Sequence, residues 1–203
     1  MSTSAQSNGK GAAAVAKAVA LHLEGKLQDA LRELNQALEA GEQTPDLFAA
    51  RGHIQFELSQ FDDAARSYAK LLELSPAHPA APFNRALCLE KLERWQEAGE
   101  AFQQSLMADA ERMDARLGLG ICLLRREQAE ASLQHFDRIL AFDEKHETAS
   151  FGKAVALQLL WRFDEAATIY QKILSRNPES EECLTNLVTI GLARKDEAMT
   201  REY

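Results

Sequence analysis

Residues 45–78 read PDLFAARGHIQFELSQFDDAARSYAKLLELSPAH, and the pattern of this stretch returns along the chain every 34 residues. Three kinds of position keep that step without a gap. They are a leucine (Leu38, Leu72, Leu106, Leu140 and Leu174), a small residue (Ala30, Ala64, Ala98, Ser132 and Ala166) and a bulky residue (Leu34, Tyr68, Phe102, Phe136 and Tyr170). A fixed period of this length predicts a stack of helical units and not a single closed core.

The period divides the chain into six repeats, with predicted starts at positions 11, 45, 79, 113, 147 and 181. Each repeat reads as two helices of about fourteen residues, roughly 21 Å long at the usual helical rise. Short polar turns separate the helices and are expected at residues 24–26, 58–60, 93–94, 126–128 and 161–162. Pro45 and Pro79 begin their repeats, where the missing N–H group of proline costs nothing.

The eighth position of each repeat is small, as in Ala18, Gly52, Ala86, Gly120 and Ala154. A glycine inside a helix costs about 1 kcal/mol relative to alanine. We expect close approach of the second helix of the repeat to offset this cost, because a side chain there would hold the two backbones apart.

Small residues at positions eight and twenty, a bulky residue at twenty-four and a proline near thirty-two resemble the tetratricopeptide repeat. The second repeat carries the pattern most fully, with Gly52, Ala64, Tyr68 and Pro76. The resemblance covers about residues 11–203. It implies an all-α fold, a right-handed α-solenoid of antiparallel helix pairs, in which the first helices line a concave face and the second helices a convex one.

The two ends of the chain depart from this pattern. Residues 1–10 are polar and small, so we expect a disordered tail followed by a single domain over residues 11–203. The sequence Asp196-Glu197-Ala198 echoes Asp164-Glu165-Ala166 at a spacing of 32, which predicts a sixth turn that is two residues short. Because the chain ends without an evident polar cap, we expect a fragment of a longer protein; the alternative is that residues 182–192 form an imperfect cap.

The composition excludes some classes of partner. With a formal net charge of −8, the chain lacks the excess of Lys and Arg that phosphate binding needs, so we expect no nucleic-acid partner. No apolar run is long enough to span a membrane, so we expect no membrane insertion. The run Ala12–Leu23 is interrupted by Lys17 and His22, and we interpret it as the first helix and not as a signal peptide.

The cysteines favour a reducing compartment. Cys88, Cys122 and Cys183 are odd in number and form no CxxC motif, so they do not indicate a disulfide framework. We expect buried thiols and a cytoplasmic protein.

The family resemblance places the partner-binding groove at positions two, five, six, nine, twelve and thirteen of each first helix. The expected groove consists of Phe83, Asn84, Leu87, Leu117, Ile121, Phe151 and Val155, and its rim of His53, Glu57, Lys91, Asp114 and Arg125. The apolar members predict binding of an amphipathic helix or an apolar extended segment. The alternatives are that they pack between adjacent first helices, and that the rim residues are ordinary solvated surface. The carboxylate clamp of heat-shock-chaperone adaptors is absent, since only Asn84 matches it.

No catalytic signature is present: the sequence lacks HExxH, GxSxG, GxxxxGKS and GxGxxG motifs. His22 and His53 come from adjacent repeats and are able to approach each other, but two histidines alone make a poor metal site. We therefore expect no enzyme activity, catalytic residue, metal or cofactor, and a protein-interaction adaptor that binds a protein or peptide. The alternatives are a self-assembling scaffold, which would be a homo-oligomer, and a substrate-recruiting arm of a larger enzyme.

Overall fold

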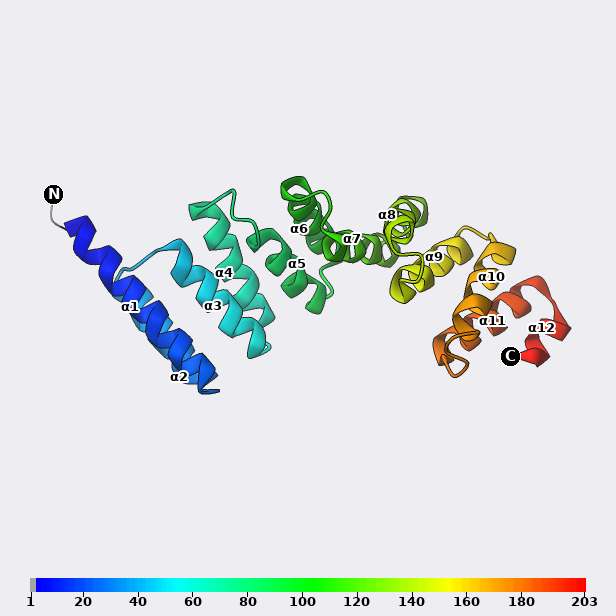
Figure 1. Ribbon diagram of the computed structural model, residues 1–203, viewed down its shortest axis with the longest axis horizontal. Helices are drawn as coiled ribbons and strands as arrows, with labels where there is room; N and C mark the ends of the chain where they lie inside the picture. Colours follow the sequence, from blue (N-terminus) through cyan, green and yellow to red (C-terminus); the bar gives the residue numbers. More distant parts are fainter. Residues whose placement is uncertain (1–2) are drawn as a thin grey trace. The chain divides into compact units, whose positions relative to one another are not determined.

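The computed structural model describes the backbone of residues 3–203 and the side chains of residues 10–196, 198–200 and 203. Every regular element in the described part of the chain is a helix (Figure 1). In order they are α1 (Thr3–Leu23), α2 (Leu27–Glu39), α3 (Pro45–Glu57), α4 (Phe61–Leu74), α5 (Ala81–Lys91), α6 (Trp95–Ala108), α7 (Met113–Arg125), α8 (Ala129–Phe142), α9 (Glu147–Leu159), α10 (Phe163–Leu174), α11 (Glu181–Arg194) and α12 (Glu197–Glu202). The prediction of an all-α solenoid built from helix pairs is confirmed.

The chain forms two compact parts, which we call the N-terminal half (through Arg112, α1–α6) and the C-terminal half (from Met113, α7–α12). The boundary coincides with the predicted start of the fourth repeat. In a repeat protein each repeat packs mainly on its neighbours, so compact parts end where a repeat ends. The sequence, by comparison, predicted one domain over residues 11–203.

The first helices begin where the period places them. Helices α3, α7, α9 and α11 start at the predicted positions 45, 113, 147 and 181, and α5 starts two residues after position 79. Thr44 caps α3, because its Oγ1 accepts a hydrogen bond from the N–H of Leu47 at 3.3 Å. His146 does the same for α9 through Nδ1, which accepts from the N–H of Ala149 at 3.2 Å.

Helix α1 is longer than the sequence predicted. It begins at Thr3, whereas residues 1–10 were expected to form a disordered tail; residues 1 and 2 lie outside the described part. No proline occurs between residues 3 and 23. A helix that is already nucleated by its packed segment extends at low cost per residue, which accounts for the additional turns.

The turn between the two helices of each repeat contains one residue with a left-handed backbone. Its φ is +75° at Gly25 and +56° to +61° at the five equivalent positions, Ser59, Glu93, Glu127, Trp161 and Lys195. These six positions keep the 34-residue step to the end of the chain. The prediction of a shortened sixth turn is therefore wrong: Asp196 N–H bonds to Gly191 O as Arg162 N–H bonds to Leu157 O one repeat earlier.

Glycine is expected to stabilise the fold at these turns. A residue with a side chain costs about 1–2 kcal/mol in the left-handed region. Glycine avoids this cost, but it loses more conformational entropy on folding, which cancels part of the gain. We expect Glu127→Gly to raise the free energy of unfolding by about 0.5–1 kcal/mol, measured by urea denaturation. Glu127→Ala is the control, because alanine keeps the strain and is expected to match the wild type; a gain with alanine as large as with glycine would contradict this explanation.

The small eighth positions adjoin the bulky side chain of the second helix, as expected. A Cβ atom built on Gly52 would lie 3.0 Å from Tyr68 Cζ, and one on Gly120 would lie 2.9 Å from Phe136 Cε1. The bulky residues Leu34, Phe102, Phe136 and Tyr170 are fully buried. The three cysteines are buried and unpaired, as predicted, and burial raises the pKa of Cys88 to about 12.

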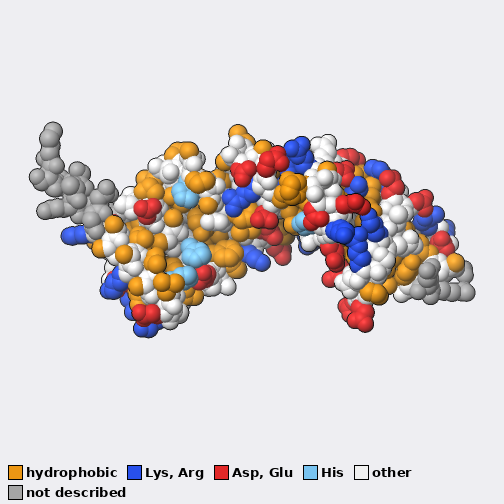
Figure 2. Space-filling model, in the orientation of Figure 1, with side chains coloured by type: hydrophobic (Ala, Val, Ile, Leu, Met, Phe, Trp, Pro, Cys, Tyr) orange, Lys and Arg blue, Asp and Glu red, His pale blue; other side chains and the backbone are white. Residues whose placement is uncertain are grey.

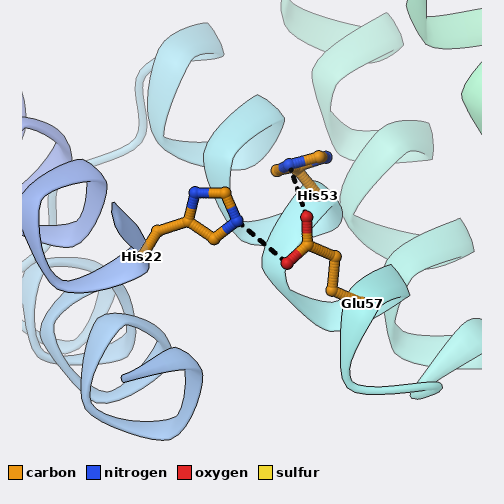
Figure 3. Close-up of side chains that lie close together, drawn as sticks. All are labelled: His22, His53 and Glu57. Atoms are coloured by element: carbon orange, nitrogen blue, oxygen red, sulfur yellow. Dashed lines mark hydrogen bonds and ion pairs between the residues drawn. The ribbon is translucent and has the colours of Figure 1, made fainter. Parts of the chain in front are cut away.

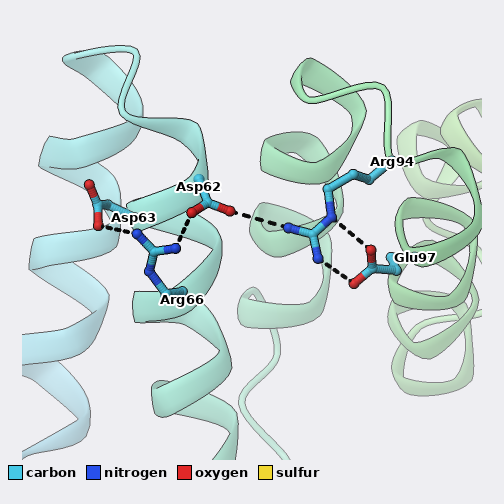
Figure 4. Close-up of polar contacts among 5 residues, drawn as sticks. All are labelled: Asp62, Asp63, Arg66, Arg94 and Glu97. Carbon is cyan, nitrogen blue, oxygen red and sulfur yellow. Dashed lines mark hydrogen bonds and ion pairs between the residues drawn. The ribbon is translucent and has the colours of Figure 1, made fainter.

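An exposed chain of alternating charges joins α4 to the turn before α6 (Figure 4). Arg66 pairs with Asp62 and Asp63, and Arg94 pairs with Asp62 at 3.2 Å and with Glu97 at 2.6 Å. Because these side chains are largely exposed, each pair is expected to contribute little to stability.

The Arg94–Glu97 pair gives a pH prediction. The hydrogen bond from Arg94 lowers the pKa of Glu97, so the pair stabilises the fold while Glu97 is ionised, and this contribution is lost as the pH falls through the lowered pKa. In Arg94→Gln we expect the pKa of Glu97 to return toward its ordinary range, about 4.3. A ¹³C NMR titration of the Glu97 carboxyl group measures the change, and an unchanged titration would contradict the assignment.

Candidate functional site

The predicted groove residues of the N-terminal half lie on α5 and are half-buried. The ring of Phe83 packs edge-on against Phe102, with 5.8 Å between ring centroids, and the guanidinium carbon of Arg112 lies 3.9 Å from the Phe83 centroid. Phe83 is therefore engaged in packing between α5 and α6. Asn84 and Leu87 are also half-buried, and both line a cavity.

The predicted groove residues of the C-terminal half are half-buried as well. Leu117 and Ile121 pack against a core that contains Phe136. Phe151 packs edge-on against Tyr170 at 5.7 Å and, like Val155, joins the core around α9–α11. These four side chains therefore pack to a large extent within the fold, as the alternative interpretation of the groove residues predicted.

The predicted rim residues are all exposed: His53 and Glu57 on α3, Lys91 at the end of α5, and Asp114 and Arg125 on α7. His53 and Glu57 lie one helical turn apart, with 3.0 Å between Nε2 and Oε1. They are the two rim residues that the structure brings together.

A cavity of about 200 Å³ opens between α3, α4 and α5, and we call it the α3–α5 pocket. Its lining consists of His53, Phe56, Tyr68, Asn84 and Leu87. The sequence predicted His53, Asn84 and Leu87 as groove or rim residues, and Phe56 occupies groove position twelve of its repeat. Tyr68 was treated only as a core residue. On the face of the N-terminal half seen in Figure 2, histidine side chains lie among hydrophobic ones.

Local packing explains how the pocket forms. The missing side chain at Gly52 allows the ring of Tyr68 to lie against α3, where a Cβ would be 3.0–3.1 Å from three ring atoms. Tyr68 is almost fully buried, and burial raises the pKa of its hydroxyl group, with a hydrogen bond from Asn84 as a smaller, opposing influence. Phe56 is held by an edge-to-face contact with Phe61 at 5.3 Å.

The pocket combines two apolar walls, Phe56 and Leu87, with polar groups on His53, Asn84 and Tyr68. Small-molecule sites usually enclose about 300–1,000 Å³, so a pocket of about 200 Å³ fits one side chain of a polypeptide better than a free cofactor. The imidazole and amide groups supply donors and acceptors for the backbone beside such a side chain.

Two of the larger cavities have less convergent linings. One of about 600 Å³ between α1 and α3 is lined by small and polar residues (Ala12, Val15, Ala16, Gln43, Thr44, Pro45 and Asp46). One of about 430 Å³ at α9–α11 is lined by Glu147, Thr148, Phe151, Ile173, Ser180, Glu182 and Cys183. The second contains Phe151, which the sequence assigned to the groove.

The sequence did not predict the exposure of two aromatic residues, Phe142 and Trp161. Trp161 is 77% exposed in the turn between α9 and α10, where its backbone is left-handed, and its ring contacts Phe163 at 5.6 Å. The sequence predicted a turn at residues 161–162, and the structure has it there. Among the described helices, none has both the length and the apolar character that crossing a bilayer requires.

Comparison with known proteins supports the assignment of the repeats. Family models described as tetratricopeptide repeats match residues 49–112, 91–155 and 148–180. Tetratricopeptide repeat protein 16 from Homo sapiens is 39% identical over 54 residues, which represent 27% of this chain and only 6% of that protein. The chain therefore corresponds to a small part of that relative.

Several solved structures have the same fold. A tetratricopeptide repeat protein from Parabacteroides merdae ATCC 43184 has a TM-score of 0.78 and 21% identity, covering 93% of this chain and 75% of that one. MamA has a TM-score of 0.76 and 16% identity, covering 85% and 94%. YrrB, described as a TPR protein with an unusual peptide-binding site, has a TM-score of 0.69 and 20% identity, covering 83% and 87%.

Proposed function

Because the chain belongs to the tetratricopeptide-repeat family, we propose that it is a non-catalytic adaptor that binds a segment of another protein, and that the α3–α5 pocket receives an apolar side chain of that segment. The fold favours protein partners. The finer assignment rests on one observation: three residues predicted from groove positions, His53, Asn84 and Leu87, line a single pocket with Phe56 and Tyr68.

The half-buried state of Leu87 supports this site. A side chain that is partly exposed at the mouth of a pocket gains from being covered by a ligand, because the remaining apolar surface leaves water on binding. The side chains of Phe83 and Phe151 have already found ring partners in the fold, so they contribute less to an open surface. We propose a cytoplasmic location, which the three reduced thiols fit.

A charge placed in the pocket is expected to weaken binding strongly. Peptides are selected from a displayed random library against the wild-type chain, and their affinities are then measured for Leu87→Glu by fluorescence anisotropy. We expect Leu87→Glu to weaken binding at least tenfold, because an apolar side chain of the peptide would have to cover and desolvate a carboxylate. Helical content, measured by circular dichroism, is expected to stay at the wild-type value.

Gln104→Glu is the matched control, because it adds the same charge at an exposed position of α6. We expect this variant to bind as the wild type does. Ile121 is left unchanged in this test, since it packs against the core that contains Phe136 and a glutamate there would disturb folding. Equal affinity of Leu87→Glu and Gln104→Glu for the selected peptides would place the binding site elsewhere.

A further inference from the structure

His22, His53 and Glu57 bring three metal-binding groups together on the first helices of the first two repeats (Figure 3). His22 lies in the last turn of α1, and the other two lie one turn apart on α3. Nε2 of His22 lies 2.9 Å from Glu57 Oε2, and Nε2 of His53 lies 3.0 Å from Glu57 Oε1. One ligand atom from each of the three residues lies within 4.8 Å of the other two.

The cluster is ordered and accessible. The two imidazole rings are in edge contact at 5.4 Å, with both Nε2 atoms directed at the same carboxylate (Figure 3). The side chains of His22, His53 and Glu57 are 29%, 56% and 34% exposed, so an ion reaches them without opening the fold. Within the described part of the chain, no second group of three such residues converges in this way.

We propose that these three residues bind one Zn²⁺ ion, which joins α1 to α3. Two imidazole nitrogens and one carboxylate oxygen form a donor set that zinc binds with tetrahedral geometry, leaving a fourth position for water. Ca²⁺ and Mg²⁺ prefer oxygen ligands throughout, so the two imidazoles disfavour them. The sequence expectation of no metal counted only the two histidines; the structure adds the carboxylate of Glu57 as the third ligand.

The rearrangement needed is small. Zinc–ligand bonds of about 2.0–2.2 Å place tetrahedral ligand atoms roughly 3.4 Å apart. The hydrogen-bonded pairs at 2.9 and 3.0 Å therefore separate by about half an ångström, and any pair of ligand atoms as far apart as 4.8 Å closes by about 1.4 Å. The Glu57 carboxylate, which now accepts from both rings, turns one oxygen to the metal.

The ion would stabilise the packing of the first repeat on the second. A ligand that binds the native state and not the unfolded chain raises stability by mass action. Because His22 belongs to the first repeat and His53 and Glu57 to the second, the added stability concerns the contact between α1 and α3. This proposal stands independently of peptide binding, although His53 also lines the α3–α5 pocket.

Titration with zinc chloride tests the site. The full chain, with any affinity tag removed, is titrated by isothermal calorimetry in a buffer that does not chelate metals. We expect one Zn²⁺ per chain, and binding at least tenfold weaker in His22→Ala and in Glu57→Gln, with unchanged circular dichroism for both. Zinc is also expected to slow amide hydrogen exchange in the last turn of α1 in the wild type and not in His22→Ala.

His135→Gln on α8 of the C-terminal half is the control, and we expect it to bind zinc as the wild type does. Wild-type affinity in His22→Ala, or a loss in His135→Gln equal to the loss in His22→Ala, would overturn the proposal. So would the absence of any zinc binding by the wild type at micromolar concentration. Glu57→Gln provides the decisive comparison, because it retains the shape of the side chain and removes only the charge of the third ligand.

Discussion

Gly152→Ala is expected to lower the free energy of unfolding of the C-terminal half by about 1–2 kcal/mol, the reverse of what helix propensity predicts. A Cβ at residue 152 would lie 2.5 Å from Phe136 Cζ and 2.7 Å from Cε1. The ring has no free space on its other side, where Gly120 already leaves only 2.9 Å for a Cβ. Overpacking a core costs about 1–3 kcal/mol, and the short distances place this site at the upper end. The cost therefore exceeds the gain of about 1 kcal/mol from replacing a helical glycine.

The midpoint of urea unfolding measures this effect. Gly11→Ala in α1 is the matched control, because a Cβ there meets its nearest neighbours at 3.3–3.6 Å and the propensity gain should dominate. Combining Gly152→Ala with Phe136→Leu removes the ring atoms that clash, so the double variant is expected to be more stable than the sum of the two single effects. Additive single effects would show that the ring is not confined between α7 and α9.

The comparison of these glycines shows how far the sequence predicts the packing. Gly52 and Gly120 occupy position eight of their repeats, and the prediction that the second helix approaches closely there is confirmed. Gly152 occupies position six, which the family resemblance assigned to the groove, yet it is buried against Phe136 of the preceding repeat. A sequence pattern defined within one repeat does not reveal that the ring of Phe136 packs against a helix of the next repeat.

The turns show a similar limit. The period located the turns, but only Gly25 reveals by its residue type that the backbone is left-handed. The five other residues at this position have ordinary side chains, so their strain is visible only in the dihedral angles. The incorrect sixth turn was predicted by matching the acidic residues near Asp196 to those near Asp164. Steps of 34 residues from Gly25 lead instead to Lys195, where the turn lies.

The candidate sites were predictable in part. Helix periodicity placed His53, Asn84 and Leu87 on the faces of first helices, but the depth of the α3–α5 pocket depends on how the Tyr68 ring lies against Gly52. The approach of His22 to a histidine of the next repeat was anticipated. The participation of Glu57 was not, because the sequence does not give the side-chain conformation that directs its carboxylate between the two rings.

Ser67→Ala is expected to destabilise the N-terminal half by about 1–3 kcal/mol, although alanine is the better helix former. Ser67 is fully buried and its Oγ donates to Gln55 Oε1 at 2.6 Å. Gln55 is 2% exposed, so removing the hydroxyl group leaves a buried carbonyl oxygen without this donor, and water has no open path to it. Thermal and urea unfolding measure the loss, and a neutral Ser67→Ala would mean that the Gln55 amide finds another partner.

Changing both partners is expected to reverse the loss. Position eleven of the repeat, where Gln55 lies, is leucine in the other four complete repeats (Leu21, Leu89, Leu123 and Leu157). Gln55→Leu combined with Ser67→Ala therefore gives the residue pair that the third repeat has at Leu89 and Ala101, and we expect stability within about 0.5 kcal/mol of the wild type or above it. The cycle formed by the two single variants and the double variant gives the coupling energy.

A third polar residue, Arg51, belongs to the same hydrogen-bond network as Ser67 and Gln55 and indicates its role. Arg51 on α3 donates to Asn35 Oδ1 of α2 at 2.9 Å and to Ser67 Oγ of α4 at 3.0 Å, so the network joins the first repeat to the second. Polar groups at this position hold adjacent helices in register at little net gain in stability. The double variant should accordingly keep its unfolding midpoint while amide exchange in α2 becomes faster; unchanged exchange would show that Arg51 and Asn35 maintain the contact without Ser67.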